Sequence, residues 1–201
     1  ISKLFTTTAI MQLRDAGKLQ LDDPVAKYLP WFKIKNAHPE GPTITIRHLL
    51  THTSGLPREA TGVNWSDLTM PKREEMIRRI AEQETVFPAE TEWKYSNFGL
   101  TLAGEIVASV SGEPWAHYVE GRILRSLGMK TTTAVPTSGL PHLAVVYGRR
   151  VHGSPRAVEP FLDIEAERPA GSLAWPVEDL ARYASLQFRD GPAGGAQILK
   201  G

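Results

Sequence analysis

Three polar residues in two short stretches of the sequence carry groups that could do chemistry. Lys3 lies at the start of a helical pattern, and Tyr95 and Asn97 flank Ser96 directly before an apolar run. An amine, a phenol and a carboxamide can move protons and orient a substrate carbonyl around a nucleophile. Taken singly, each also has an ordinary interpretation, as a solvated helix lysine, a packed tyrosine and a helix-start asparagine.

Two predicted helices must hold these residues. Apolar side chains recur at three- and four-residue steps from Ile1 to Ala16, and Gly17 follows as a stop. The stretch from Ser96 to Val110 is amphipathic and rich in Leu, Ala, Ile and Val, with Gly112 at the C-cap position. Shorter helices are expected over residues 24–29, 46–54, 71–81, 114–127 and 176–189.

Strand signals are few. Thr43 to Ile46 is a brief extended stretch, and Leu143 to Val151 has the composition of a strand between turns containing Pro and Gly. The helical period disappears between Ala134 and Pro169. The pattern therefore predicts several helices and little sheet, as in one lobe of a larger α/β (α+β) enzyme.

The composition is that of an ordinary folded protein and limits the partner classes. With 23 basic and 22 acidic residues, the formal charge is +1, which gives no broad electrostatic footprint for nucleic acid or an anionic membrane surface. No apolar run approaches the ~20 residues that a membrane-spanning helix needs. The absence of cysteine excludes disulfides and a thiol nucleophile in this segment and leaves localisation open. A small molecule or a peptide is the expected partner, and oligomeric state is not predicted.

The stretch from Thr45 to Leu56, TIRHLLTHTSGL, is the most specific match to a known family. It resembles a segment of the class C β-lactamase and penicillin-binding-protein family of serine hydrolases. Tyr95-Ser96-Asn97 resembles the family's Tyr-x-Asn motif, and Ile1-Ser2-Lys3 resembles the last three residues of its Ser-x-x-Lys motif. Gly17 to Leu19, Leu21 to Val25 and Pro169 to Ser172 also resemble family segments in the expected order.

On this resemblance, the nucleophilic serine would stand immediately before Ile1. No serine in the chain has a lysine three residues later, and no Gly-x-Ser-x-Gly elbow is present. The family's third motif, Lys or His followed two places later by Gly, is also absent. We therefore expect residues 1–201 to be a fragment of a single β-lactamase-like catalytic domain, incomplete at both ends. Such a fragment would comprise the helical lobe and part of the antiparallel sheet region, and would be inactive alone.

The resemblance implies a role for each candidate catalytic residue, Lys3, Tyr95 and Asn97. Residues three apart share a helix face, so a serine before Ile1 would lie beside the Lys3 amine. A partly desolvated cleft disfavours an ammonium and makes a neutral amine available as a base. Tyr95 is the other candidate base, and the choice between the two stays open. Asn97 would accept from Lys3 and donate to a substrate carbonyl.

Other residues are weaker candidates. His48 and His52 have a metal-ligand spacing, but neither a following glutamate nor a third ligand is evident, so no metal or cofactor is predicted. We expect both imidazoles to be structural and to be satisfied by Thr51, Thr53 and Ser54. Most of the five tryptophans are expected to pack in the protein, and Trp93, two residues before Tyr95, is the first candidate for a cleft.

The resulting hypothesis is a serine hydrolase that acts through an acyl-enzyme on an ester, a β-lactam or a D-amino-acid peptide. The alternative is a non-catalytic homologue that keeps the fold as a binding or regulatory module. The residue before Ile1 separates the two: serine favours the enzyme, and alanine or glycine favours the binding module.

Overall fold

The computed structural model describes residues 1–150, 152–188 and 196–200. In these ranges the elements, in chain order, are α1 (Ser2–Asp15), α2 (Val25–Tyr28), α3 (Ile46–Thr51), α4 (Arg73–Arg79), η1 (Ile80–Glu82), α5 (Asn97–Ser111), α6 (Trp115–Tyr118), the π-helical η2 (Val119–Leu124), η3 (Glu165–Glu167), α7 (Arg168–Gly171) and α8 (Val177–Leu186). None of the helices in this part of the chain is long and apolar enough to cross a bilayer.

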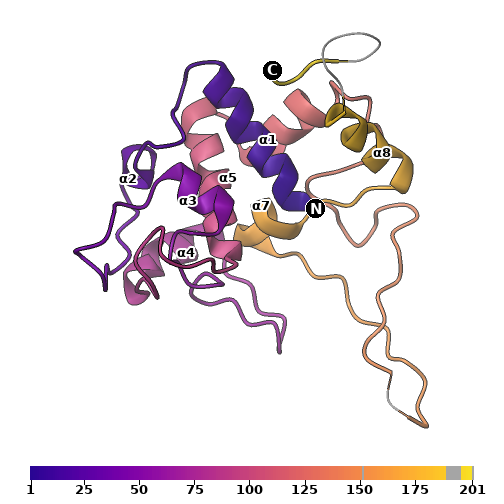
Figure 1. Cartoon of the computed structure of the whole chain (residues 1–201). Coiled ribbons are helices and arrows are strands. Elements are labelled where there is room, and N and C mark those ends of the chain that lie inside the picture. The colour runs from indigo at the N-terminus through magenta and orange to yellow at the C-terminus, as the bar shows by residue number, and fades with distance from the viewer. Residues whose placement is uncertain (151, 189–195, 201) are drawn as a thin grey trace.

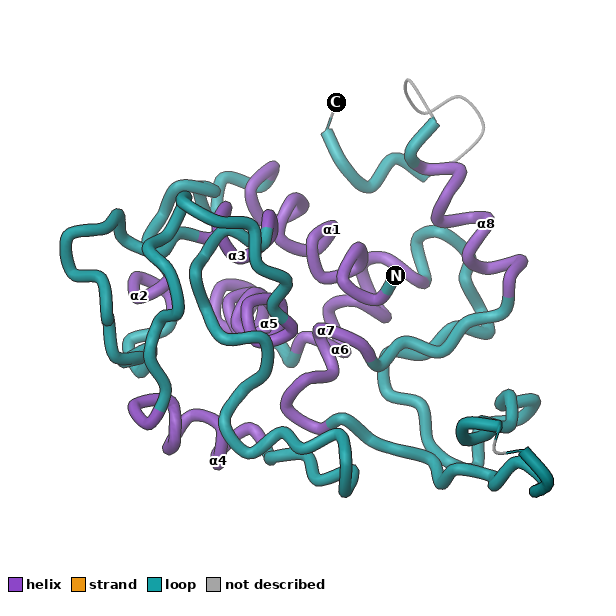
Figure 2. Tube along the Cα trace, turned by 60° about the horizontal axis from the view of Figure 1, so that its bottom comes forward, coloured by secondary structure: helices purple, strands orange, loops and turns teal. Residues whose placement is uncertain are grey.

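Helix α5 lies at the centre of the helical body, and Figure 2 looks almost along its axis with other helices around it. Nine of its residues are buried, from Phe98 to Val107, because neighbouring helices cover more of its surface than the one apolar stripe expected from the sequence. Helices α1, α3, α6 and α7 all pack against it. α1 contributes Phe5, Ile10 and Leu13 to the same core.

The helix ends follow from local chemistry. The Ser96 side chain caps α5 by accepting from the Gly99 N–H at 2.9 Å, and Gly112 ends the helix with φ 78°, a left-handed conformation that costs glycine little. Thr45 caps α3 as predicted. The helix expected over 114–127 is present as α6 and the π-helical η2.

A close approach of two elements fixes the position of α7. A Cβ at Gly104 in α5 would overlap Cβ and Cγ of Pro169, so only glycine allows this spacing without movement. The sequence pattern did not predict η3 and α7, because segments of three and four residues are too short to show a helical period. α7 nevertheless lies directly against α1 and α5.

The predicted strand over 143–151 and the antiparallel sheet region are corrected by the structure. The described residues contain no strand, only isolated bridges, one of which pairs Tyr147 with Val158. Two backbone bonds flank that bridge, from Gly148 N to Ala157 O and from Glu159 N to Val146 O. A lone two-stranded pair is marginal in water, and Val145 and Val146 lie exposed beside it. Figure 1 shows this segment extending away from the helical body.

The last predicted helix is present as α8. It ends at Leu186, and position 189, where the predicted range ends, lies outside the described residues.

Candidate active site

Lys3 lies in the first turn of α1, and its amine is held by two other segments. Nζ donates to Asn97 Oδ1 at 2.6 Å and to the Ala170 carbonyl oxygen at 2.7 Å. These acceptors belong to α5 and α7, 94 and 167 residues away along the chain. The amine is therefore fixed where α1, α5 and α7 meet.

Buried polar contacts keep α1 against α7. The Thr6 hydroxyl donates to the Pro169 carbonyl oxygen at 2.7 Å and accepts from Trp115 Nε1 at 3.0 Å. The Leu173 N–H donates to Ser2 Oγ at 3.2 Å. Since these groups are shielded from water, losing any one bond would leave an unsatisfied partner, and the three together set how α1 presents Lys3.

Tyr95 faces the same amine. Lys3 Nζ lies 4.8 Å from the centroid of the Tyr95 ring, a cation–π distance. The His52 ring lies on the tyrosine as well, with centroids 4.7 Å apart and planes inclined by 32°. The Arg58 guanidinium is 5.4 Å from the ring centroid. Tyr95 is thus positioned by two cations and an imidazole.

His52 is a neutral support for this ring. Its Nδ1 accepts from the Ser96 N–H at 3.2 Å, and burial, followed by the nearby charge of Lys3, lowers the pKa of the imidazole. His52 has φ 60°, a left-handed conformation that is uncommon outside glycine and ends α3. The histidine therefore adds no positive charge beside Lys3 at neutral pH.

Asn97, the first residue of α5, connects the amine to a carboxylate. Its Nδ2 donates to Glu59 Oε2 at 2.9 Å and Oε1 at 3.1 Å, while its Oδ1 accepts from Lys3. The Asn97 backbone N–H donates to the Arg58 carbonyl oxygen at 2.7 Å. Only one orientation of the amide satisfies both contacts, because the Glu59 carboxylate needs a donor and the Lys3 ammonium needs an acceptor.

Sequence reasoning missed two carboxyl groups behind Asn97. Glu59 accepts from Arg58 Nε at 3.0 Å as well as from Asn97. Glu167 is 1% exposed and accepts from the Ala60 N–H at 3.1 Å. The available signals were weak: Glu59 lies three residues after the matched stretch that ends at Leu56, and Glu167 lies two residues before Pro169.

The prediction for the two histidines was wrong about their partners. His48 forms a reciprocal capping box with Thr45, and its Nε2 lies 2.8 Å from Glu90 Oε1. The Thr51 and Thr53 hydroxyls bond each other instead, at 2.8 Å. Among the residues that the structure describes, no three His, Asp or Glu side chains gather as a metal site.

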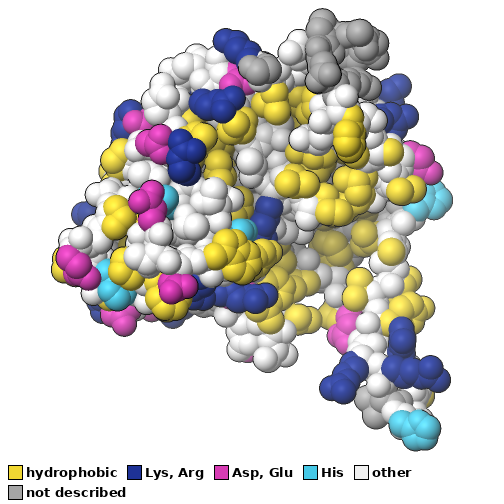
Figure 3. All heavy atoms as spheres, viewed as in Figure 1, with side chains coloured by type: hydrophobic (Ala, Val, Ile, Leu, Met, Phe, Trp, Pro, Cys, Tyr) yellow, Lys and Arg dark blue, Asp and Glu magenta, His cyan; other side chains and the backbone are white. Residues whose placement is uncertain are grey.

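Trp93 is 67% exposed, and its ring meets the edge of His52 at a centroid distance of 6.0 Å. Ile1 and Leu4 are also exposed. Figure 3 shows hydrophobic side chains around a hollow on this face, with basic and histidine side chains within it. Trp115, by contrast, is buried, and Trp31 and Trp175 pack against the core.

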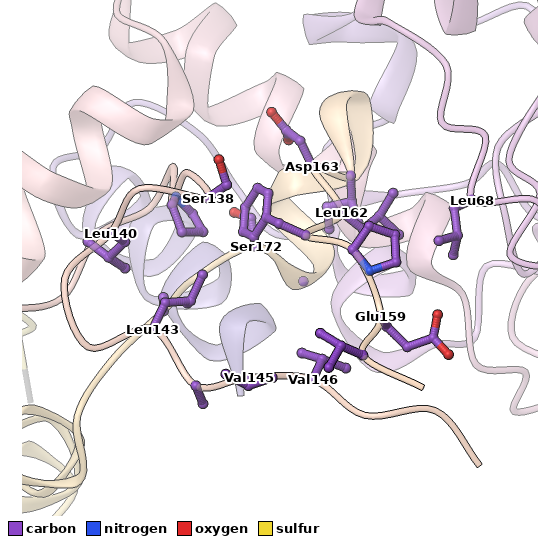
Figure 4. Close-up of a pocket in the computed structure, with 18 of the residues that line it drawn as sticks. Leu68, Ser138, Leu140, Leu143, Val145, Val146, Glu159, Leu162, Asp163 and Ser172 are labelled. Carbon is purple, nitrogen blue, oxygen red and sulfur yellow. The ribbon is translucent and has the colours of Figure 1, made fainter. Parts of the chain in front are cut away.

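A second feature is a cavity of about 1000 Å³ beside α7, lined by both apolar and polar side chains. Figure 4 shows Leu140, Leu143, Val145 and Val146 along one wall, with Leu162 and Leu68 further round. The segments 136–146 and 158–164 supply most of its lining, and Ser172 is also part of it. The lining of this cavity does not include Lys3, Tyr95 or Asn97. It does include Gly171, the residue after Ala170.

The helical fold is that of part of a β-lactamase-like domain. The β-lactamase family model matches residues 1–200, and the chain belongs to this family of serine hydrolases. Its relatives include class C β-lactamases, penicillin-binding proteins, esterases and D-peptidases.

Three relatives illustrate the match. The chain is 31% identical over 196 residues to Beta-lactamase-like protein 2 of Dictyostelium discoideum. The aligned region covers 96% of the chain and 35% of that protein. It is 33% identical over 139 residues to the D-alanyl-D-alanine-carboxypeptidase/endopeptidase AmpH of Escherichia coli K12, covering 68% of the chain and 36% of that protein. A D-stereospecific amidohydrolase from Streptomyces sp. superposes with a TM-score of 0.79 at 26% identity, over 99% of the chain and 60% of that structure. The chain thus spans only part of the length of these relatives.

Proposed function

We propose that the intact protein is a serine hydrolase that works through an acyl-enzyme, with Lys3, Tyr95 and Asn97 around a nucleophilic serine immediately before Ile1. The observation that carries this proposal is the position of Lys3, which is bonded to Asn97 and lies against the ring of Tyr95. Helical spacing continued one turn ahead of Lys3 would place a serine three residues earlier on the same face as its amine.

In this proposal the serine hydroxyl attacks the substrate carbonyl carbon as its proton passes to a base. Lys3 and Tyr95 are the two groups that we propose to take that proton and return it to the leaving group. The tetrahedral intermediate then collapses, which releases the leaving group and forms the acyl-enzyme. Water releases the acyl group in a second addition and elimination at the same carbon.

Asn97 has an orienting role in the proposal. Its oxygen holds Lys3, and its nitrogen is held by Glu59, so the amide keeps the lysine directed at the nucleophile's position. Preorganisation of this kind removes reorientation from the reaction step. The exposed Trp93 ring beside His52 is placed to cover an apolar part of the substrate.

The substrate classes are an ester, a β-lactam and a D-amino-acid peptide, all of which present an acyl carbon to the same machinery. The names of two relatives, a D-alanyl-D-alanine carboxypeptidase/endopeptidase and a D-stereospecific amidohydrolase, support including D-configured amides in the assay panel. A p-nitrophenyl ester, nitrocefin and a D-alanyl-D-alanine peptide would rank the three classes by kcat/KM. We propose residues 1–201 as one part of a single catalytic domain, so they alone should turn over none of these substrates.

The test is active-site labelling of the intact protein with a fluorophosphonate, followed by peptide mapping. We expect the label on the serine before Ile1 and its loss in Lys3→Ala. Strong labelling that persists in both Lys3→Ala and Tyr95→Phe would refute the mechanism. Alanine or glycine at the serine position, with no labelling, would instead support a binding module that keeps the fold.

A further inference from the structure

A continuous set of hydrogen bonds leads from the buried backbone to the Lys3 amine. The Ala60 N–H donates to Glu167 at 3.1 Å, and the Glu59 carboxyl raises the pKa of Glu167 through its charge and a hydrogen bond. Glu59 accepts from Asn97 Nδ2, and Asn97 Oδ1 accepts from Lys3. Four segments of the chain therefore contribute to one hydrogen-bond network that ends at the proposed catalytic amine.

The contact between the two carboxyl groups requires a proton. Two ionised carboxylates are both acceptors and cannot bond each other, so one of them must carry an O–H. Glu167 is the more buried, and burial raises its pKa to about 8, with the negative charge of Glu59 adding to the effect. Glu59 already accepts from the Arg58 guanidinium and from Asn97, so Glu167 is the partner that supplies the O–H.

We infer that Glu167 and Glu59 form a proton-sharing acid pair that positions Asn97, with protonated Glu167 donating to Glu59 so that Glu59 holds the amide nitrogen and leaves the amide oxygen on Lys3. This inference deepens the proposed function and rests on it. Glu167 and Glu59 are positioning residues, because they act on the reacting groups only through Asn97. Without the acceptor behind it, the Asn97 amide could rotate and turn its N–H groups toward the ammonium.

Loss of the shared proton should break this hydrogen-bond network. Two adjacent carboxylates repel each other, and Glu59 would then move away from Glu167 or from Asn97. The charged side chains that act on Glu167 are Glu59, from the loop after α3, and Lys3, from α1. On the elements packed against η3, Arg73 of α4 is paired with Glu105 of α5, and Arg168 of α7 is paired with Asp163. The proposal therefore predicts a fall in reactivity on the alkaline side of neutral pH.

The experiment measures the rate of fluorophosphonate labelling of the serine against pH in the intact protein. In the wild type we expect the rate to fall above about pH 8, where Glu167 ionises. Glu167→Gln supplies a donor that does not titrate, so its rate at pH 7 should stay within about threefold of wild type and its alkaline fall should disappear. Glu167→Ala should lose on the order of 10²-fold at pH 7, because the amide is no longer held.

Glu165→Gln is the matched control, since Glu165 lies two residues away and contacts Arg168 rather than the site. It should keep both the rate and the alkaline fall. An alkaline fall in Glu167→Gln with the same midpoint as in the wild type would overturn the inference.

A second measurement does not depend on reactivity. Infrared difference spectroscopy of the intact protein should detect a protonated carboxyl group at pH 7 in the wild type that is missing in Glu167→Gln. The absence of this band from the wild type would also overturn the acid pair. If the wild type is never labelled, the proposed function fails, while the infrared band still decides whether the acid pair exists.

Discussion

Lys3 Nζ lies 2.6 Å from Asn97 Oδ1, although 94 residues separate the two along the chain. The second acceptor of Lys3, the Ala170 carbonyl oxygen, comes from yet another segment. The amine thus has two fixed acceptors and an aromatic face beside it, and its position depends on the packing of three helices.

Replacing Lys3 with methionine should remove hydrolysis while keeping the helix. Methionine has a similar length and a good helix propensity but no proton to accept or donate. We expect kcat of the intact protein on its best ester substrate to fall by about 10²–10⁴-fold. Circular dichroism should be unchanged. Lys18→Met, at an exposed position just after α1, is the control and should keep full activity; equal activity in Lys3→Met would contradict the role of the amine.

Tyr95→Phe separates the hydroxyl from the ring. The phenyl ring would keep its stacking with His52 and its contact with Lys3, so the melting temperature should change little. If the phenol transfers protons, kcat should fall by about 10²–10⁴-fold. Tyr147→Phe, at an exposed tyrosine far along the chain, should have no effect. A Tyr95→Phe enzyme as active as that control would leave Lys3 as the only candidate base.

Gly104→Ala should destabilise the protein and disturb the site together. The added methyl group overlaps Pro169, so α7 must shift away from α5 or the side chain must be accommodated with strain. The cost should be about 1–3 kcal/mol in the free energy of unfolding, measured by urea denaturation. Gly121→Ala is the matched control, because a Cβ there meets no neighbouring atom and its φ is not left-handed. That variant should be neutral or slightly stabilising.

Asp179 in α8 should make stability depend on acid pH. Burial alone would raise its pKa, but hydrogen bonds from Thr131 and Thr132 and the charge of Arg182 outweigh burial and lower the pKa below 3.8. A group with a lowered folded pKa contributes stability above its unfolded pKa and loses it as the pH falls through the folded pKa. Asp179→Asn should therefore unfold more easily at pH 7, by about 1–3 kcal/mol.

The difference between Asp179→Asn and the wild type should shrink as the pH falls below about 4. Urea midpoints at pH 7 and at the lowest pH where the wild type stays folded would test this. Asp67→Asn, on an exposed loop, should show a much smaller change at pH 7. A difference for Asp179→Asn that is constant across this range would contradict the assignment.

The sequence was informative where local patterns specify structure. The helical period and caps predicted α1 and α5, and with them the elements that carry Lys3 and Asn97. It was uninformative where structure depends on tertiary contact. The carboxyl groups of Glu59 and Glu167 meet although the residues are far apart in the chain, and nothing near either residue marks the other. The strand expected over 143–151 failed for the same reason, because a strand needs a partner that its own sequence cannot supply.

Because Lys3 and its acceptors are far apart along the chain, the site forms only when the helices have packed together. The backbone hydrogen bonds of a helix form within its own residues, whereas Lys3 and its two acceptors lie on three separate helices of the described structure. A partly folded state with native helix content but undocked helices would look intact by far-ultraviolet circular dichroism and would lack the cluster altogether. Chemical reactivity of this cluster would therefore distinguish the native state from a molten globule.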